Sequence, residues 1–176
     1  MIVGRAVAAF IAAAACFACG GSGSTPHTLL RLDDVAAAVT AVEQARGGAQ
    51  RYTEINVGPG LVNLFVVVDD TTELAYVYRN GKLEAPGAPT PRVEGSTEFD
   101  LTTVDVSATV GFDDRLRKDL PDSVLTRLGL IDAPPTGLAW RALLTSAKGG
   151  TFEVIFGADG SLIGALPNAD PSVDSP

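Results

Sequence analysis

Two tight-turn signals limit the fold of this chain more than any other feature of its sequence. Asn80-Gly81 and Asp159-Gly160 each stand between two short runs rich in aliphatic, aromatic and β-branched residues. Such dipeptides favour two-residue β-hairpin turns, because Asn, Asp and Gly accept the positive φ angles that these turns need. The sequence therefore predicts at least two antiparallel hairpins, one near the middle of the chain and one near its end.

A helix is predicted before the first hairpin. Apolar residues recur at helical spacing after Asp33, and Gly47-Gly48 ends the pattern, which indicates a helix over residues 33–46. The next runs predict strands over 52–57, 61–68, 74–79 and 82–83. The run at 61–68 is nearly all apolar, as expected for a strand at the centre of a sheet.

The second half is predicted to repeat this order with a less regular helical part. Phe112, Leu116 and Leu120 are spaced by four, which indicates a helix that Pro121 ends. Residues 124–128 predict a further short turn of helix ending at Gly129. Residues 97–106 predict an additional strand.

An offset of 79 residues aligns the two halves without a gap. It pairs Gly58 with Gly137 and places Asn80-Gly81 on Asp159-Gly160. We therefore predict an α+β fold of two layers, with helices packed on one face of a largely antiparallel sheet. The predicted tandem helix-strand-strand-strand units cover 29–85 and 97–167, with a Pro- and Gly-rich linker at 86–96. The pattern leaves open whether the units share one sheet.

The N-terminal segment is typical of a bacterial lipoprotein precursor. Arg5 is followed by an apolar run over 6–17, which is shorter than the ~20 apolar residues of a membrane-spanning helix. Ala18 is the small residue that a lipobox places before its cysteine, so residues 1–18 are predicted to be a signal peptide and Cys19 the lipidated residue. Cys16, which also follows an alanine, is the alternative acceptor.

Residues 19–28 are rich in Gly and Ser and predict a flexible tether, and residues 168–176 predict a disordered tail. Attachment is then expected at the extracytoplasmic face of the cell membrane, through acyl chains such as palmitate. More than one chain is needed for stable anchoring.

The strand, Asn/Asp-Gly, strand pattern of 74–83 and 152–162 carries a family resemblance. With its tandem organisation, the chain resembles PepSY-type domains and the β-lactamase inhibitor protein family, which are extracytoplasmic tandem helix-plus-sheet units. The resemblance implies the two-layer architecture given above. With its lipobox, the chain also looks like small secreted lipoproteins of actinobacterial type, a likeness that implies no activity.

Composition removes several classes of function. A formal charge of −8 disfavours nucleic acid as a partner. The only histidine, His27, falls in the predicted tether, where it cannot be held as a general base, and both cysteines precede the predicted domain. No catalytic constellation, no metal site and no cofactor are therefore expected. A carboxylate-dependent hydrolase is a remote alternative.

Aromatic residues define a candidate interaction surface of Tyr76, Tyr78 and Trp140. In the aligned strands, Glu153 is expected to point away from the core, which places Tyr76 and Tyr78 on the exposed face of the sheet. Trp140 and Arg141 alternate, so only one of them can share that face. Tyr, Trp and Arg are the residues enriched at binding hot spots.

These observations predict a lipid-anchored, extracytoplasmic binding or interaction protein that is not an enzyme. The first expectation is that it presents a sheet face to a protein or peptide partner. The alternative is a carrier of a lipid or other apolar ligand in a cavity between helices and sheet. That alternative requires a cavity on the order of several hundred Å³.

Overall fold

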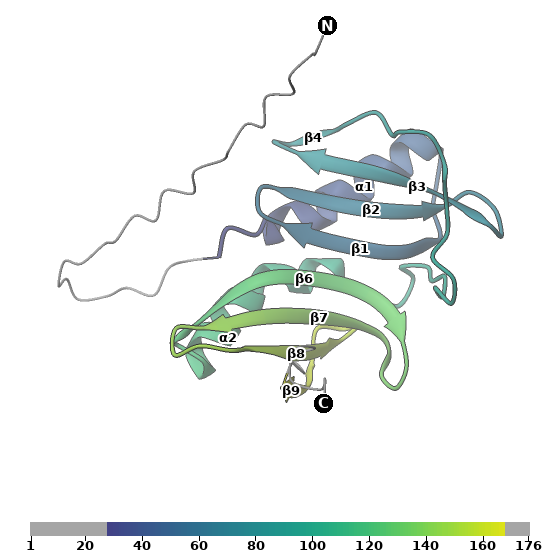
Figure 1. Cartoon of the computed structure of the whole chain (residues 1–176). Coiled ribbons are helices and arrows are strands. Elements are labelled where there is room, and N and C mark those ends of the chain that lie inside the picture. Colours follow the sequence, from purple (N-terminus) through teal and green to yellow (C-terminus); the bar gives the residue numbers. More distant parts are fainter. Residues whose placement is uncertain (1–27, 168–176) are drawn as a thin grey trace, which may run out of the picture.

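Both predicted hairpin turns join strands of a single antiparallel sheet (Figure 1). The computed structural model describes residues 28–167, and in them the fold is α+β, with two α-helices and a sheet of nine strands. The predicted signal peptide, Cys16, Cys19, His27, all of the tether except Thr28, and the predicted tail lie outside the described residues.

The elements follow one another in a simple order. They are the 3₁₀ helix η1 (Leu32–Asp34), α1 (Val35–Arg46), β1 (Tyr52–Gly58), β2 (Leu61–Val67), β3 (Thr72–Arg79), β4 (Lys82–Leu83), β5 (Thr90–Pro91), the 3₁₀ helix η2 (Val106–Gly111), α2 (Phe112–Asp119), β6 (Ser123–Ala133), β7 (Gly137–Ser146), β8 (Thr151–Gly157) and β9 (Leu162–Pro167).

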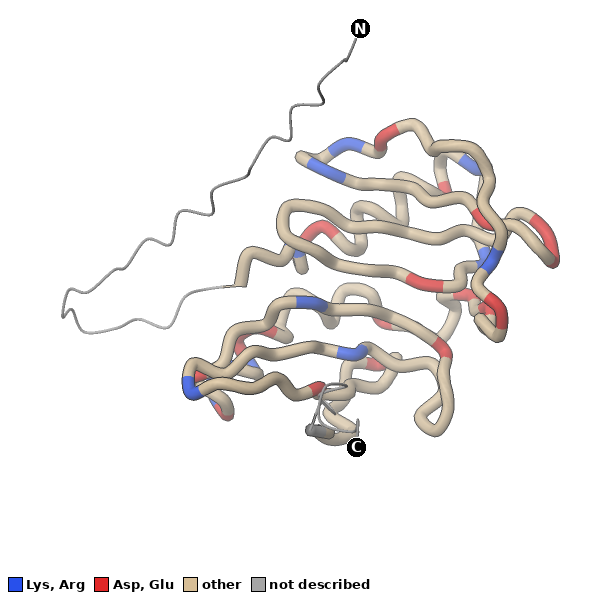
Figure 2. Tube along the Cα trace, viewed as in Figure 1, with Lys and Arg blue, Asp and Glu red and all other residues tan. Residues whose placement is uncertain are grey.

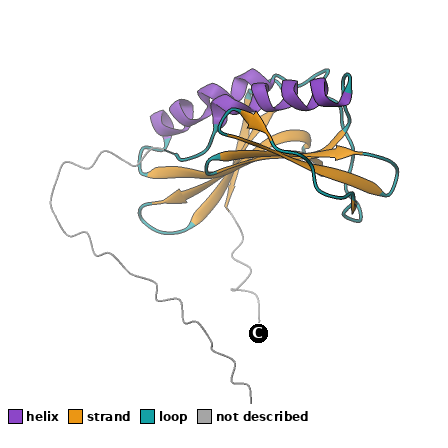
Figure 3. Cartoon of the chain, turned by 90° about the horizontal axis from the view of Figure 1, so that it is seen from above, coloured by secondary structure: helices purple, strands orange, loops and turns teal. Residues whose placement is uncertain are grey.

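One sheet contains both halves of the chain. Its strand order is β4-β3-β2-β1-β6-β7-β8-β9, and β5 pairs with β3. The halves join where β1 pairs antiparallel with β6, with Ile55 opposite Leu130 and Asn56 opposite Gly129. Both helices lie on the same side of the sheet (Figure 3). The other side, which faces the viewer in Figure 1, is called here the open face.

Helix α1 confirms the helix predicted for residues 33–46. Its apolar stripe of Val35, Ala38, Val39 and Val42 is buried in the core. Gly47 ends the helix in the left-handed conformation, with φ of 82°, and its N–H bonds to the carbonyl of Glu43.

The predicted hairpin over Asn80-Gly81 is also confirmed. Asn80 and Gly81 have φ of 52° and 76°, the positive values of a type I′ turn, and Arg79 lies opposite Lys82 across it. The strands predicted at 52–57 and 61–68 are present as β1 and β2. The Pro-rich segment is not wholly irregular, because Thr90 and Pro91 form β5 at an edge of the sheet, where a missing N–H is tolerated.

The short helix predicted at 124–128 is wrong, because these residues form the start of β6. A β-bulge between Leu125 and Arg127 inserts one extra residue into the strand. The buried residues Leu125 and Leu128 are therefore three positions apart, a spacing that imitates a helix.

The strand predicted at 97–106 is wrong as well. Only a single bridge forms there, between Phe99 and Tyr52, whose rings stack at 6.3 Å between centroids. Beyond it, Asp100 and Asp105 accept hydrogen bonds from the residues two positions later, Thr102 and Ser107. Such local bonds compete with strand pairing and leave a loop followed by η2.

The β2–β3 turn depends on one aspartate, which gives a pH-dependent prediction. Asp69 accepts hydrogen bonds from the backbone N–H and hydroxyl groups of Thr71 and Thr72, which lower the pKa of its carboxyl to about 2. Because this pKa lies below the ordinary value of 3.8, ionised Asp69 stabilises the fold fully above pH 3.8, and the stabilisation is lost as the pH falls through 2.

We therefore expect Asp69→Ala to lower the melting temperature at neutral pH and this difference to shrink between pH 4 and pH 2. Thermal unfolding followed by circular dichroism measures it, with Asp70→Ala as the neighbouring control. A deficit that is the same at both ends of this range would contradict the assignment.

Candidate ligand-binding pocket between α2 and the sheet edge

Aromatic packing fixes α2 on the sheet. Phe112, the first residue of α2, is fully buried, and Leu116 follows one turn later on the same face. The Phe112 ring stacks on Phe156 of β8 with 4.2 Å between centroids and meets Trp140 of β7 edge-on at 6.1 Å. These contacts hold the first turn of α2 against β7 and β8.

Arg115 ties the same helix to the β8–β9 turn. Its guanidinium lies 4.8 Å from the Phe112 ring centroid and 5.3 Å from that of Phe156, within the range of cation–π attraction. It also donates a hydrogen bond to the carbonyl of Gly160 at 2.7 Å. The turn can approach this closely because Gly160 has no side chain. A Cβ there would lie 2.5 Å from the Cβ of Ala108 in η2.

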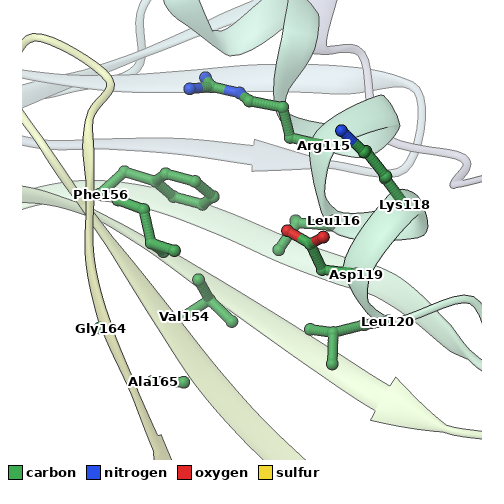
Figure 4. A pocket seen from close by; sticks show the side chains of 10 residues that line it. Arg115, Leu116, Lys118, Asp119, Leu120, Val154, Phe156, Gly164 and Ala165 are labelled. Carbon is green, nitrogen blue, oxygen red and sulfur yellow. The ribbon is translucent and has the colours of Figure 1, made fainter.

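Beyond this contact, α2 and the β8–β9 hairpin diverge around an apolar pocket of about 430 Å³. Figure 4 shows Leu116 and Leu120 on the α2 side of the pocket and Val154 and Phe156 on the β8 side. The complete lining is Arg115, Leu116, Lys118, Asp119, Leu120, Val154, Phe156, Leu162, Gly164 and Ala165.

The mouth of the pocket combines apolar and charged groups. Lys118 and Asp119, at the end of α2, are exposed. On the opposite side, Leu162 of β9 lies opposite Phe156, lines the pocket and is 62% exposed. A site of this kind can take an apolar group inside and leave a polar end in water. Its lining contains no Ser, Cys or His that could act as a nucleophile or general base.

The interaction surface predicted from the aromatic residues is wrong. Tyr76 and Tyr78 are only 5% and 8% exposed and Trp140 is fully buried, all three within the hydrophobic core. Tyr76 pairs with Leu64 and Tyr78 with Val62 on the helix-facing side of the sheet.

The alternation of side chains explains this error. The offset of 79 residues is an odd number, and it aligns the buried Leu64 with Leu143, which lies on the open face, opposite Glu153. The residues of β2, β3, β7 and β8 in the hydrophobic core all have even numbers, so an odd offset aligns core residues with residues of the open face. Val154 and Phe156 do face the core as predicted, whereas Ala75 and Val77 do not. Of the alternating pair in β7, Trp140 enters the core and Arg141 lies on the open face.

Sequence reasoning missed the pocket itself. The spacing of Leu116 and Leu120 predicts one apolar helix face, which forms one wall of the pocket. The opposite wall depends on where the β8–β9 hairpin lies in space, which the spacing does not give. The available signal was the apolar pair Leu162-Ile163 directly after a turn, where an edge strand normally carries charge.

No helix within residues 28–167 is long and apolar enough to cross a membrane. No three His, Cys, Asp or Glu side chains in the same range gather closely enough to hold a metal ion.

No family model matches the chain, and neither a curated protein nor a solved structure is significantly similar to it. The assignment of function therefore depends on the geometry of the sites.

The contact at Gly160 gives a stability prediction. We expect Gly160→Ala to destabilise the protein by roughly 1–3 kcal/mol, because its φ of 79° is strained for alanine and the added Cβ collides with Ala108. Gly164→Ala is the matched control on β9, since a Cβ there meets nothing within 4 Å. Urea unfolding measures both variants, and equal stabilities would refute the role of Gly160.

Proposed function

We propose that this protein binds the apolar part of a lipid or a similar small amphipathic molecule in the pocket between α2 and the β8–β9 hairpin. The observation that carries the proposal is the apolar pocket itself. Its volume of about 430 Å³ falls within the range of about 300–1,000 Å³ typical of small-molecule sites.

The energetics of burial favour a hydrocarbon ligand. Each methylene group moved from water into such a site contributes about 0.8 kcal/mol. Leu116, Leu120 and Val154 supply apolar wall, and the ring of Phe156, which stacks on Phe112, lines the pocket as well. A polar end of the ligand would remain beside Lys118 and Asp119, the exposed charged residues at the mouth.

A tandem, two-layer architecture is part of the same proposal. The strand order supports it. Four strands of the first half, β4-β3-β2-β1, lie on one side of the junction, and four strands of the second half, β6-β7-β8-β9, lie on the other. A helix precedes each set of strands, with α1 before β1 and α2 before β6. This order is the one expected of PepSY-type or β-lactamase-inhibitor-protein-like units.

A second candidate function is contact with a protein partner through the open face. The observation that favours it is the position of Arg141 on that face, since Arg is enriched at binding hot spots. Neither candidate function includes catalysis.

The pocket proposal is tested by filling the cavity. We expect Ala165→Phe to weaken binding of a fluorescent fatty acid, 11-(dansylamino)undecanoic acid, by about tenfold or more, because the ring would occupy the space between β9 and α2. Ala75→Phe is the matched control, since Ala75 is an exposed strand residue away from the pocket. Fluorescence titration measures both, and equal affinities, or no binding by the unchanged protein, would reject the site.

Membrane attachment is proposed through acyl chains on Cys19, at the extracytoplasmic face. We expect Cys19→Ala to move the protein from the membrane fraction to the soluble fraction of cells, because stable anchoring requires the acyl chains. Cys16→Ala should leave the protein in the membrane fraction. The opposite pattern would identify Cys16 as the acceptor.

A further inference from the structure

A second cavity lies at the end of the sheet where β1 and β3 begin and β6 ends. It has a volume of about 300 Å³, and residues 93–97, in the segment that follows β5, line one of its sides. Figure 2 shows acidic positions at this end of β1 and β6, on the right in that view. Four of the lining residues are acidic and none is basic, so the cavity is called here the acidic pocket. The four are Glu54, Glu73, Glu94 and Asp132.

Glu73 of β3 is the buried carboxylate of the acidic pocket. It is only 6% exposed, although it forms no ion pair with a described residue. Glutamate is almost never buried to this extent unless a cation pairs with it. Arg92 follows β5 beside β3, but it bonds instead to Glu98 and to the carbonyl of Ser96. The buried charge of Glu73 therefore points to a cation that the described residues do not supply.

A β-bulge places a hydroxyl group beside this carboxylate. Thr53 is the extra residue of the bulge in β1, which lies between Tyr52 and Glu54. Its hydroxyl donates a hydrogen bond to Oε2 of Glu73 at 2.6 Å. The other oxygen, Oε1, accepts no bond from a described residue, and it is not one of the unpaired atoms that the fold seals from solvent. One oxygen of the carboxylate is therefore fixed, and the other is open to a ligand in the acidic pocket.

The chemistry of the site favours an ammonium group. An ammonium ion can pair with a single oxygen, whereas a guanidinium group bonds best to both oxygens of a carboxylate, and one of them is already occupied here. A metal ion is disfavoured, since no three acidic side chains within residues 28–167 gather closely enough to bind one. Val93 and Ile131 also line the acidic pocket and offer aliphatic contacts to the carbon chain of an amine.

We propose that the acidic pocket binds an alkylammonium ion, with its charge on Oε1 of Glu73 and its carbon chain along Val93 and Ile131. Two sources present this group, a free aliphatic amine and the lysine side chain of a protein. Glu94 and Asp132 form no ion pair with a described residue, so their charges add to the attraction. The acidic pocket shares no lining residue with the apolar pocket, so this proposal does not depend on lipid binding.

The test is a titration of ¹⁵N-labelled protein with n-pentylammonium chloride, in about 0.15 M sodium chloride to screen weak binding at the surface. We expect shifts in the amide resonances of Thr53, Glu73 and Ile131 at millimolar concentration. The alcohol 1-pentanol, which has the same chain without the charge, should cause none. Methylammonium, which lacks most of the chain, should bind about tenfold more weakly or worse, because each methylene group moved out of water favours binding.

Two variants test the role of the buried carboxylate. Glu73→Gln keeps the shape of the side chain and an acceptor for Thr53 but removes the charge, so it should weaken pentylammonium binding about tenfold or more. Its melting temperature should not fall, since the substitution removes a buried charge that has no partner. Glu43→Gln on α1 is the matched control, because it removes the same charge but does not line the acidic pocket.

The proposal is overturned if pentylammonium and 1-pentanol shift the same resonances equally, or if neither shifts them. It is also overturned if Glu73→Gln binds pentylammonium as tightly as the unchanged protein does. The peptide acetyl-Gly-Gly-Lys-Gly-Gly-amide distinguishes the two sources. If it binds at least as tightly as pentylammonium, the ligand is a lysine side chain of a protein, and if it binds more weakly, the ligand is a free amine.

Discussion

The pairing between β1 and β6 is the constraint on which the rest of the structure depends. Only three residue pairs make this junction, with Ile55 and Val57 opposite Leu130 and Leu128. All four side chains are buried on the helix-facing side, so the junction also continues the hydrophobic core from one half to the other. On the open face, the same register places Asn56 beside Gly129, and both residues line a cavity of about 270 Å³.

The sequence alone predicts those elements that are determined by residues close together along the chain. Helix α1 follows from its apolar stripe and its glycine stop, and the Asn80-Gly81 hairpin follows from residues that accept positive φ. These patterns act within a few positions along the chain. The strand order did not follow from them, because it depends on pairing between residues far apart in sequence, such as Ile55 and Leu130.

Two of the predictions that failed, the helix at 124–128 and the exposed aromatic surface, depend on which face of a strand each residue occupies. A single bulge in β6 made Leu125 and Leu128 look helical, and another in β1, between Tyr52 and Glu54, changes which residues share a face. Tyr76 and Tyr78 were assigned to the open face because the gapless alignment has an odd offset, whereas only an even offset matches the core residues of β3 with those of β8. Turn chemistry identified both hairpins correctly, but it does not report whether a strand contains an extra residue.

Strand β8 contributes different side chains to the two faces of the sheet. Val154 and Phe156 face α2 and line the apolar pocket, while Glu153 points to the open face and forms an ion pair with Arg141. Neighbouring residues of a strand point to opposite sides, so the sheet separates the pocket from this ion pair although both involve β8. Ala165 lies opposite Val154 on β9, so a substitution of Ala165 changes the pocket without altering the side chains of the open face.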